Sequence, residues 1–267
     1  MKKTPFNYLL MLSILLIYPF ASIVSQVDLQ QPFKDCNLEG SITIYDYKNK
    51  KWTYSDEADA KVATLPASTF KILNSMIALE TGVIKDENVV FKWDGQKRFV
   101  ESWNADTDLK NAFKNSTVWY YVELAKMLGK KKYKRYLKKS QYGNGNLSEK
   151  GDDFWNIGNF AVSPINQIWM LIKLHDEQLP FSKRTFDIVK NIMIVEKNEN
   201  YTLRAKTGWT TYGNNNIGWY IGYVERNDNV WFFATRLHKK VLTAEDNFQS
   251  CRKIITNKIL KEMKIIE

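Results

Sequence analysis

The chain has 267 residues, of which 44% are hydrophobic and 14% aromatic, and its formal net charge is +10. This length and composition fit one domain with a large core and exclude a fibrous or intrinsically disordered class. The two cysteines cannot by themselves supply the four ligands of a usual zinc site, and the chain has only two histidines. Neither His175 nor His238 lies in a motif of a histidine-dependent hydrolase. We therefore expect no metal.

The first 25 residues have the pattern of a secretory signal peptide. Lys2 and Lys3 form a short basic start, and an apolar run follows from Tyr8 to Val24. Small residues at its end place the cleavage after Ser25. The run of about 17 residues is at the short end of what spans a bilayer, so an uncleaved membrane anchor is the alternative. We expect cleavage, and therefore no stable anchor in the mature chain.

Export predicts a periplasmic or secreted location for the mature chain, residues 26–267, which would form a single catalytic domain. Such a compartment permits a disulfide between Cys36 and Cys251. The sequence leaves open whether the two cysteines pair, because their separation along the chain says nothing about distance in the fold. It also leaves open whether the protein is a monomer or a homodimer.

A dense basic run lies in the middle of the chain. Its charged members are Lys130, Lys131, Lys132, Lys134, Arg135, Lys138 and Lys139. The run could be read as a nucleic-acid patch, but it is interleaved with Tyr133, Tyr136 and Leu137. That spacing favours the solvated face of an amphipathic helix, so we expect no nucleic-acid partner.

Period-two and helical patterns alternate along the chain. A hairpin is predicted from Ser41–Asp46 and Lys51–Tyr54. A helix is predicted over Thr69–Glu80, ending at Thr81-Gly82, and the pattern stays mostly helical through about residues 70–195.

The last part of the chain returns to strands. Three are predicted: Thr202–Trp209, Ile217–Glu225 and Val230–Leu237. Turns are expected at Asn214–Asn216 and Asn227–Asn229, and a final helix from about Ala244 with Thr243 as its cap. The predicted class is α+β, or mixed α/β: an antiparallel sheet from the two ends of the chain, flanked by helices, with a central helical subdomain. A cleft between the two parts is the expected place for a site.

The strongest chemical pattern is Ser68 followed by Lys71 at the start of a predicted helix. Residues three apart on a helix share a face, so the two side chains can meet. A serine hydroxyl needs a neighbour that accepts its proton, and an ammonium cannot do so. Apolar burial and the positive end of the helix would lower the pKa of Lys71. Taken alone, the spacing is common in helices.

Further motifs follow in a fixed order: Ser116-Thr117-Val118, Tyr142-Gly143-Asn144, Phe154-Trp155 and Lys206-Thr207-Gly208. With the Ser68–Lys71 pair they resemble the penicillin-recognising serine enzymes, and among these the class D, or OXA-type, β-lactamases. The resemblance covers essentially the whole mature chain and implies a β-lactamase/transpeptidase-like fold. It implies hydrolysis of small β-lactam substrates.

The resemblance also implies roles at the matching positions. Ser68 corresponds to the acylated nucleophile. Lys71 corresponds to a lysine that takes up carbon dioxide to become N6-carboxylysine, the general base, so that carbon dioxide is a covalent modifier and no other cofactor is expected. Val118 would form an apolar wall, and Trp155 would donate its indole N–H to the carbamate.

The remaining roles concern the substrate. Ser116 would relay a proton between Ser68 and Lys206, and Lys206 would place positive charge near the substrate carboxylate. The backbone N–H groups of Ser68 and Trp209 would form an oxyanion hole. The other positions matched to substrate binding are Tyr142, Asn144, Thr207, Gly208 and Arg252, of which Arg252 would grip the carboxylate with its planar guanidinium.

One position departs from the family pattern. The residue after Trp155 is usually Leu, and here it is Asn156. A polar amide in the carbamate pocket would admit water and weaken the retention of carbon dioxide, unless the side chain turns outward.

Two other functions remain open at this point. A penicillin-binding D,D-peptidase shares Ser68, Lys71, Ser116 and the Lys-Thr-Gly motif, but its second motif normally ends in Asn where this chain has Val118. A β-lactam sensor is acylated and stays so, but its relatives place the domain behind a multi-span membrane segment.

Overall fold

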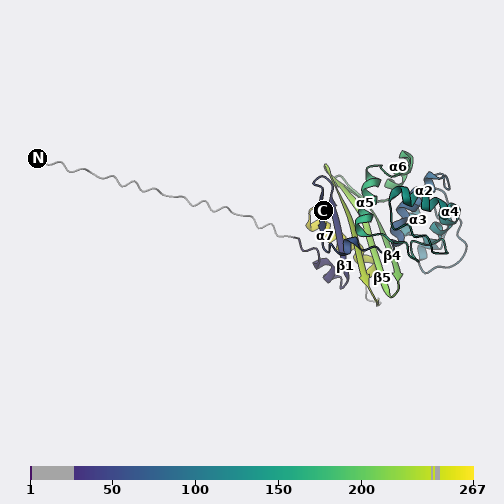
Figure 1. Ribbon diagram of the computed structural model, residues 1–267, viewed down its shortest axis with the longest axis horizontal. Coiled ribbons are helices and arrows are strands. Elements are labelled where there is room, and N and C mark those ends of the chain that lie inside the picture. Colours follow the sequence, from purple (N-terminus) through teal and green to yellow (C-terminus); the bar gives the residue numbers. More distant parts are fainter. Residues whose placement is uncertain (2–26, 242, 244–246) are drawn as a thin grey trace.

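The computed structural model describes Met1 and residues 27–241, 243 and 247–267, so that the expected signal peptide falls outside it except for Met1. The described residues form a six-stranded antiparallel sheet in the order β2-β1-β6-β5-β4-β3, with helices on both faces (Figure 1). This confirms the predicted α+β class and the antiparallel sheet built from both ends of the chain. Among these residues, no helix is long and apolar enough to cross a membrane.

The elements have the following bounds. The strands are β1 Glu39–Asp46, β2 Lys51–Tyr54, β3 Ile194–Lys197, β4 Tyr201–Tyr212, β5 Asn215–Arg226 and β6 Asn229–Lys239. The helices are α1 Gln31–Asp35, α2 Lys71–Glu80, α3 Leu109–Asn115, α4 Val118–Ser140, α5 Pro164–His175, α6 Lys183–Ile192 and α7 Phe248–Glu262.

The three predicted C-terminal strands are present, and each is longer than its hydrophobic pattern indicated. Asn215, Asn216 and Asn229 were expected in turns but pair within the ladder. The turns are tighter because single residues adopt positive φ, 58° at Gly213 and 54° at Asn227. Asparagine and glycine tolerate this left-handed conformation, which makes two-residue hairpin turns possible.

The expected helical region, residues about 70–195, contains more than helices. Strand β3 begins inside it and pairs antiparallel with the first part of β4. The sequence analysis missed this strand because it has only four residues and its burial is one-sided, so it carries almost no period-two signal. β3 covers β4 only as far as Arg204, and the rest of that edge of β4 has no neighbouring strand among the described residues.

The sheet separates two apolar cores. On one face, residues such as Trp219, Ile221 and Tyr223 pack against α2 and the other helices of the middle region. On the opposite face, Tyr220 and Val224 pack against α1 and α7. This alternation follows from the period of two along β5. Each fully buried large apolar side chain stabilises the fold by about 1.5–3 kcal/mol.

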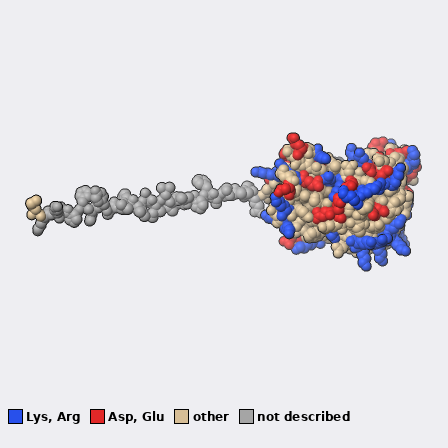
Figure 2. All heavy atoms as spheres, turned by 90° about the horizontal axis from the view of Figure 1, so that it is seen from above, with Lys and Arg blue, Asp and Glu red and all other residues tan. Residues whose placement is uncertain are grey.

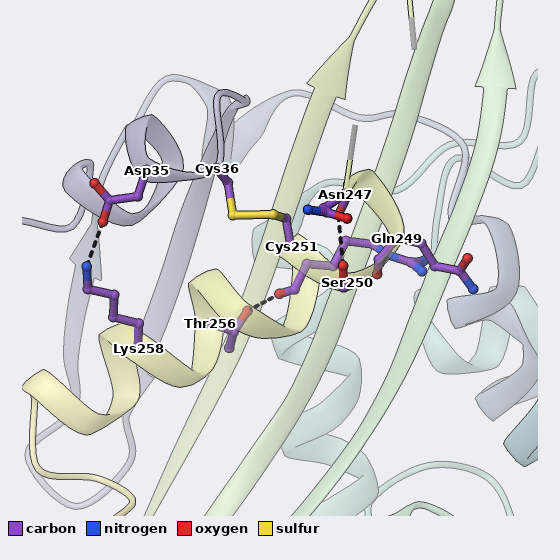
Figure 3. Close-up of a disulfide and its surroundings, with 9 residues drawn as sticks. Asp35, Cys36, Asn247, Gln249, Ser250, Cys251, Thr256 and Lys258 are labelled. Carbon is purple, nitrogen blue, oxygen red and sulfur yellow. Dashed lines mark hydrogen bonds and ion pairs between the residues drawn. A yellow bond between two sulfur atoms is a disulfide. The ribbon is translucent and has the colours of Figure 1, made fainter. Parts of the chain in front are cut away.

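Helix α7 is tied to the start of the domain by a disulfide. Cys36, directly after α1, is bonded to Cys251 of α7, with 6.2 Å between their Cα atoms (Figure 3). An ion pair between Asp35 and Lys258 at 2.6 Å joins the same two helices. The pairing question left open by the sequence is thereby answered. Because the disulfide is adjacent to Arg252, it anchors the turn of α7 that carries this residue.

The start of α7 differs from the sequence expectation. The helix begins at Phe248 with Asn247 as its N-cap, four residues later than predicted, so Thr243 does not cap it. Residues 244–246, which were expected to form its first turn, lie outside the described residues.

The basic run lies in the second half of α4, after a break at Gly129 with φ 71° and ψ 153°. Tyr133 and Leu137 are buried, whereas the side chains of Lys131, Lys134 and most other charged members are exposed. This confirms the amphipathic interpretation. Figure 2 shows lysine and arginine side chains gathered densely along one edge of the body.

Candidate active site

Ser68 and Lys71 lie where a short 3-10 helix, Ala67–Phe70, runs directly into α2. The Lys71 Nζ donates a hydrogen bond to the Ser68 Oγ at 3.0 Å. Ser68 is 7% exposed and Lys71 is fully buried, so the hydroxyl is accessible and its partner is not. Ala67 has a φ of 51°, and its N–H donates to the carbonyl of Trp155 at 2.9 Å. This bond fixes the turn that presents Ser68.

The environment of Lys71 shifts its protonation equilibrium towards the neutral amine. Burial lowers its pKa to about 8, and the nearby Asp153 carboxylate opposes that shift. The Nζ lies 4.9 Å from the centre of the Tyr121 ring on α4. Val118 begins the same helix and, three residues earlier, shares this side of it. An uncharged amine can accept a proton or attack an electrophile such as carbon dioxide.

Trp155 has a hydrogen-bond donor that no described residue uses. The side chain is fully buried and stacks on Phe70 at 5.4 Å between ring centres. Its Nε1–H has no acceptor among the described residues. A buried, unpaired donor is costly unless a partner is supplied. The chemistry of this site therefore fits a carboxylate-like group on Lys71, since the indole can only donate.

Asn156 does not turn outward into solvent. Its Nδ2 donates to the Asp153 Oδ1 at 2.8 Å, and its own Oδ1 is buried with no donor among the described residues. Its main-chain carbonyl accepts from Thr210 Oγ1 at 2.6 Å, which holds the segment to β4. Asn156, which replaces the usual Leu of the family, thus binds a carboxylate, that of Asp153, through its side-chain amide.

Asp153 was missed by the sequence analysis. Burial raises the pKa of this carboxyl to about 6, against the lowering effect of the Asn156 hydrogen bond and the Lys71 charge. The available signal was an acidic residue two positions before Trp155. Acidic residues at such a spacing are usually solvated, so no local pattern indicated that this one lies near Lys71.

Ser116 and Lys206 form the opposite wall. Ser116 lies between α3 and α4 in a left-handed conformation, with φ 56°, and its Oγ accepts a hydrogen bond from the Lys206 Nζ. Lys206, on β4, is 4% exposed. Burial places the pKa of Lys206 well below its usual value, and the charges of Lys71, Arg252 and Lys253 lower it further.

The open part of β4 passes close to the nucleophile. A Cβ on Gly208 would lie 2.9 Å from the Pro66 carbonyl oxygen, so only glycine allows this approach. Thr207 precedes it on the same strand, and Trp209 follows with a side chain that is 43% exposed. This is the strand that the sequence analysis assigned to the oxyanion hole and the substrate carboxylate.

Arg252 reaches the same strand from α7. Its Nη1 donates to the Gly208 carbonyl, at 2.5 Å, and the residue is 5% exposed. Burial lowers the pKa of its guanidinium to about 10, and no carboxylate neutralises it among the described residues. A Cβ on Gly218 would lie 3.1 Å from the Arg252 Cδ, so the glycine makes room for this side chain. A buried cation without a counter-ion is suited to binding an anion.

Tyr142 and Asn144 lie behind this arrangement. Tyr142 is buried, and its hydroxyl donates to Gln167 Oε1 at 2.7 Å, while Gln167 in turn donates to Thr69 Oγ1 at 2.8 Å. The Asn144 Nδ2 donates to the carbonyl of Asn159 at 2.8 Å. Tyr142 is thus linked through Gln167 to Thr69, the residue after Ser68.

The sequence matches the penicillin-binding protein transpeptidase domain family over residues 40–261. It is 41% identical to β-lactamase OXA-48 of Klebsiella pneumoniae over 234 residues, 88% of this chain and 87% of that one. A crystal structure of a class D β-lactamase from Sebaldella termitidis is 47% identical, with a TM-score of 0.85, covering 91% of this chain and 98% of that one. The chain belongs to the class D β-lactamases.

Other class D structures agree in fold. The class D β-lactamase YbXI from Nostoc is 42% identical with a TM-score of 0.85, covering 90% of this chain and the whole of that one. Among curated relatives, β-lactamase OXA-20 of Pseudomonas aeruginosa is 39% identical over 236 residues, 84% of this chain and 87% of that one. The predicted family and its serine β-lactamase class are thereby confirmed.

Proposed function

We propose that this class D enzyme hydrolyses β-lactams through a covalent acyl-enzyme on Ser68, with Lys71 as general base in the carbamylated form. One observation carries the proposal: a serine hydroxyl 3.0 Å from a lysine amine that is wholly buried and whose pKa is lowered to about 8. Burial and hydrogen bonding make this pair a nucleophile with an adjacent base. The substrates named for the relatives, β-lactams, fit the cationic wall opposite.

In acylation, the base at Lys71 removes the Ser68 proton while the Oγ attacks the lactam carbonyl carbon. The tetrahedral oxyanion accepts hydrogen bonds from the backbone N–H groups of Ser68 and Trp209. The carbon–nitrogen bond of the ring then breaks, and the nitrogen takes a proton through Ser116, whose Oγ is hydrogen-bonded to Lys206. The products of this step are an ester on Ser68 and a ring-opened amine.

The substrate carboxylate would bind where cations face β4. Arg252, Lys206 and the Thr207 hydroxyl supply charge and a donor there. Binding this anion orients the lactam carbonyl towards Ser68. It also compensates the positive charges that burial otherwise makes unfavourable.

In deacylation, a water must lose a proton and attack the ester carbonyl. Carbon dioxide bound to Lys71 would supply an anionic proton acceptor in place of an amine. The residues that would hold it are Trp155, through its unpaired N–H, and the apolar wall at Val118. Asn156 and Asp153 form a hydrogen-bonded polar pair beside this pocket. Deacylation is therefore the step whose rate this pair would affect most.

Turnover of nitrocefin by the purified mature protein in bicarbonate buffer tests the proposal. We expect many turnovers per active site, and none with Ser68→Ala. Lys71→Ala should lose about 10⁴-fold in kcat, because general base catalysis is worth up to that factor. Lys131→Ala, an exposed lysine on α4, is the matched control and should keep full activity.

The outcomes separate the alternatives. Acylation of Ser68 that is visible by mass spectrometry but stalls would indicate a sensor or a D,D-peptidase instead of a β-lactamase. Full turnover by Lys71→Ala would disprove the mechanism while leaving the hydrolase assignment intact.

We further propose export, so N-terminal sequencing of protein from its native host should begin at Gln26.

A further inference from the structure

A cavity of about 410 Å³ lies beside the active site, between α3, β3, β4 and α7. Its charged lining residues are Lys110, Lys114, Lys206 and Lys253, and no carboxylate of the described residues lines it. The cavity reaches the catalytic machinery only at Lys206 and Thr207. Ser68, Lys71 and Arg252 are not part of its wall. It is therefore a space next to the site that binds the lactam ring.

Three lysines of this cavity, Lys110, Lys114 and Lys253, have no counter-ion among the described residues. No hydrogen bond or ion pair within the described part of the chain engages the amines of Lys110, Lys114 or Lys253. Lys253 is close enough to Lys206 to act on its charge. Like charges gathered without an anion repel one another, and an anion among them would remove this cost.

The remaining wall is largely apolar. Phe113 of α3 and Ile194 and Val195 of β3 face the same space. Phe113 also lies under the Lys206 Nζ, 5.5 Å from it at the ring centre. A ligand that satisfies both kinds of wall carries a negative charge on an apolar body.

We propose that this cavity is an anion subsite that takes a second negatively charged substituent of a β-lactam, one beyond the ring carboxylate. The substrate assignment rests on the proposed function, whereas anion binding by the cavity does not. In the proposed function the ring carboxylate would bind at Arg252 and Thr207. Thr207 also lines the cavity, whereas Ser68 does not. A dianionic substrate can therefore span both subsites.

Calorimetric titration with inorganic phosphate at constant ionic strength tests the cavity itself. The native protein should bind phosphate with a dissociation constant in the millimolar range. A Lys110→Gln/Lys114→Gln variant should bind about tenfold more weakly, because two of the four cations are gone. Both side chains are exposed, so the change leaves the core intact.

The matched control is Lys131→Gln/Lys134→Gln, which removes the same charge from exposed positions on α4. It should bind phosphate as the native protein does. Equal weakening in both variants would show that only net charge matters and would overturn the proposal. Absence of phosphate binding to the native protein would overturn it as well.

The substrate assignment is tested with two β-lactams of one skeleton, carrying one and two negative charges. The ratio of their kcat/KM values, dianion over monoanion, should fall about tenfold in Lys110→Gln/Lys114→Gln and stay constant in the control. Phosphate binding with an unchanged ratio would reject the substrate assignment. If neither compound is hydrolysed, the proposed function fails. The phosphate titration still shows whether the cavity binds an anion.

Discussion

The two buried lysines of the active site, Lys71 and Lys206, are both destabilised in their charged form by burial but have different charged surroundings. Burial lowers the pKa of both amines. Lys71 and Lys206 repel each other, but only Lys71 also has a carboxylate acting on it, that of Asp153, which opposes the shift. The charges that act on Lys206 are all positive, from Lys71, Arg252 and Lys253, and they increase the shift.

This difference separates two tasks. The Lys206 side has an excess of positive charge that an anionic substrate can neutralise, so it is suited to binding. The Lys71 side has a single amine, one carboxylate and an indole N–H without an acceptor among the described residues, so it is suited to proton transfer. The comparison predicts that pH and carbon dioxide act mainly on Lys71, whereas substrate affinity depends mainly on the Lys206 side.

The largest expected effect is the pH dependence of carbamylation. Only the neutral amine reacts with carbon dioxide, and the pKa of Lys71 is lowered to about 8. Below pH 8 the reactive fraction falls about tenfold for each pH unit. At a fixed concentration of dissolved carbon dioxide, nitrocefin turnover should therefore decline between pH 8 and 6 and recover when more carbon dioxide is supplied.

A ¹³C NMR signal of the carbamate distinguishes loss of carbamylation from a general loss of activity at low pH. Protein equilibrated with ¹³C-labelled bicarbonate should give a carbamate resonance in ¹³C NMR that weakens over the same pH range and is missing from Lys71→Ala. Turnover that follows pH while the resonance stays constant would place the titration elsewhere. The comparison of the two lysines would then lose its basis.

An intermediate effect is expected on the cationic side. Arg252→Gln removes a guanidinium that donates to the Gly208 carbonyl and has no carboxylate partner among the described residues. Charge-assisted hydrogen bonds contribute about 1.5–3 kcal/mol, so KM should rise by about tenfold to a hundredfold. Steady-state kinetics should show a smaller change in kcat.

The control for this variant is Arg252→Lys, which keeps the charge and should recover part of the affinity. The ¹³C carbamate resonance should be unchanged in both variants, because Arg252 is not among the charges that act on Lys71. A resonance that disappears in Arg252→Gln would mean that the two sides of the site are coupled and that the division of tasks is wrong.

Which side chains lie together was easier to predict from the sequence than the charges that surround them. Helix geometry predicted that the side chains of Ser68 and Lys71 meet, and they lie 3.0 Å apart. The meeting of Ser116 with Lys206, across 90 residues, was expected only from the family resemblance. Strand β3 was missed because it has only four residues, of which three are exposed, and so shows little periodicity. The start of α7 was placed too early because its N-cap residue, Asn247, makes no capping hydrogen bond. The disulfide stayed open because no local pattern encodes a contact across 215 residues.

Asp153 illustrates what sequence reasoning lacks. From the sequence, Asn156 stood out because the family usually has Leu there, and the open question was whether its amide admits water to the carbamate pocket. The structure gives that amide a specific partner, the Asp153 carboxylate at 2.8 Å. Burial of that carboxylate, which raises its pKa to about 6, depends on segments distant in the chain and is invisible in the local pattern.

The smallest expected effect tests the charge that distinguishes Lys71 from Lys206. Asp153→Asn removes the carboxylate that favours the ammonium form and that repels an anion on Lys71. Both consequences favour carbamylation, so the bicarbonate concentration for half-maximal activity at pH 7.5 should fall by about fivefold, a factor that corresponds to roughly 1 kcal/mol of charge interaction. The ¹³C resonance should reach half its maximum at the same lower concentration.

Asp152→Asn is the control for this variant, because it removes the neighbouring carboxylate, which is not among the charges that act on Lys71. Its bicarbonate dependence should match that of the native protein. Asn156→Leu adds a second arm: if the amide acts by holding Asp153, the change has no further effect in the Asp153→Asn background. Additive effects would mean that Asn156 acts on the pocket directly, by admitting water, and that Asp153 contributes only its charge.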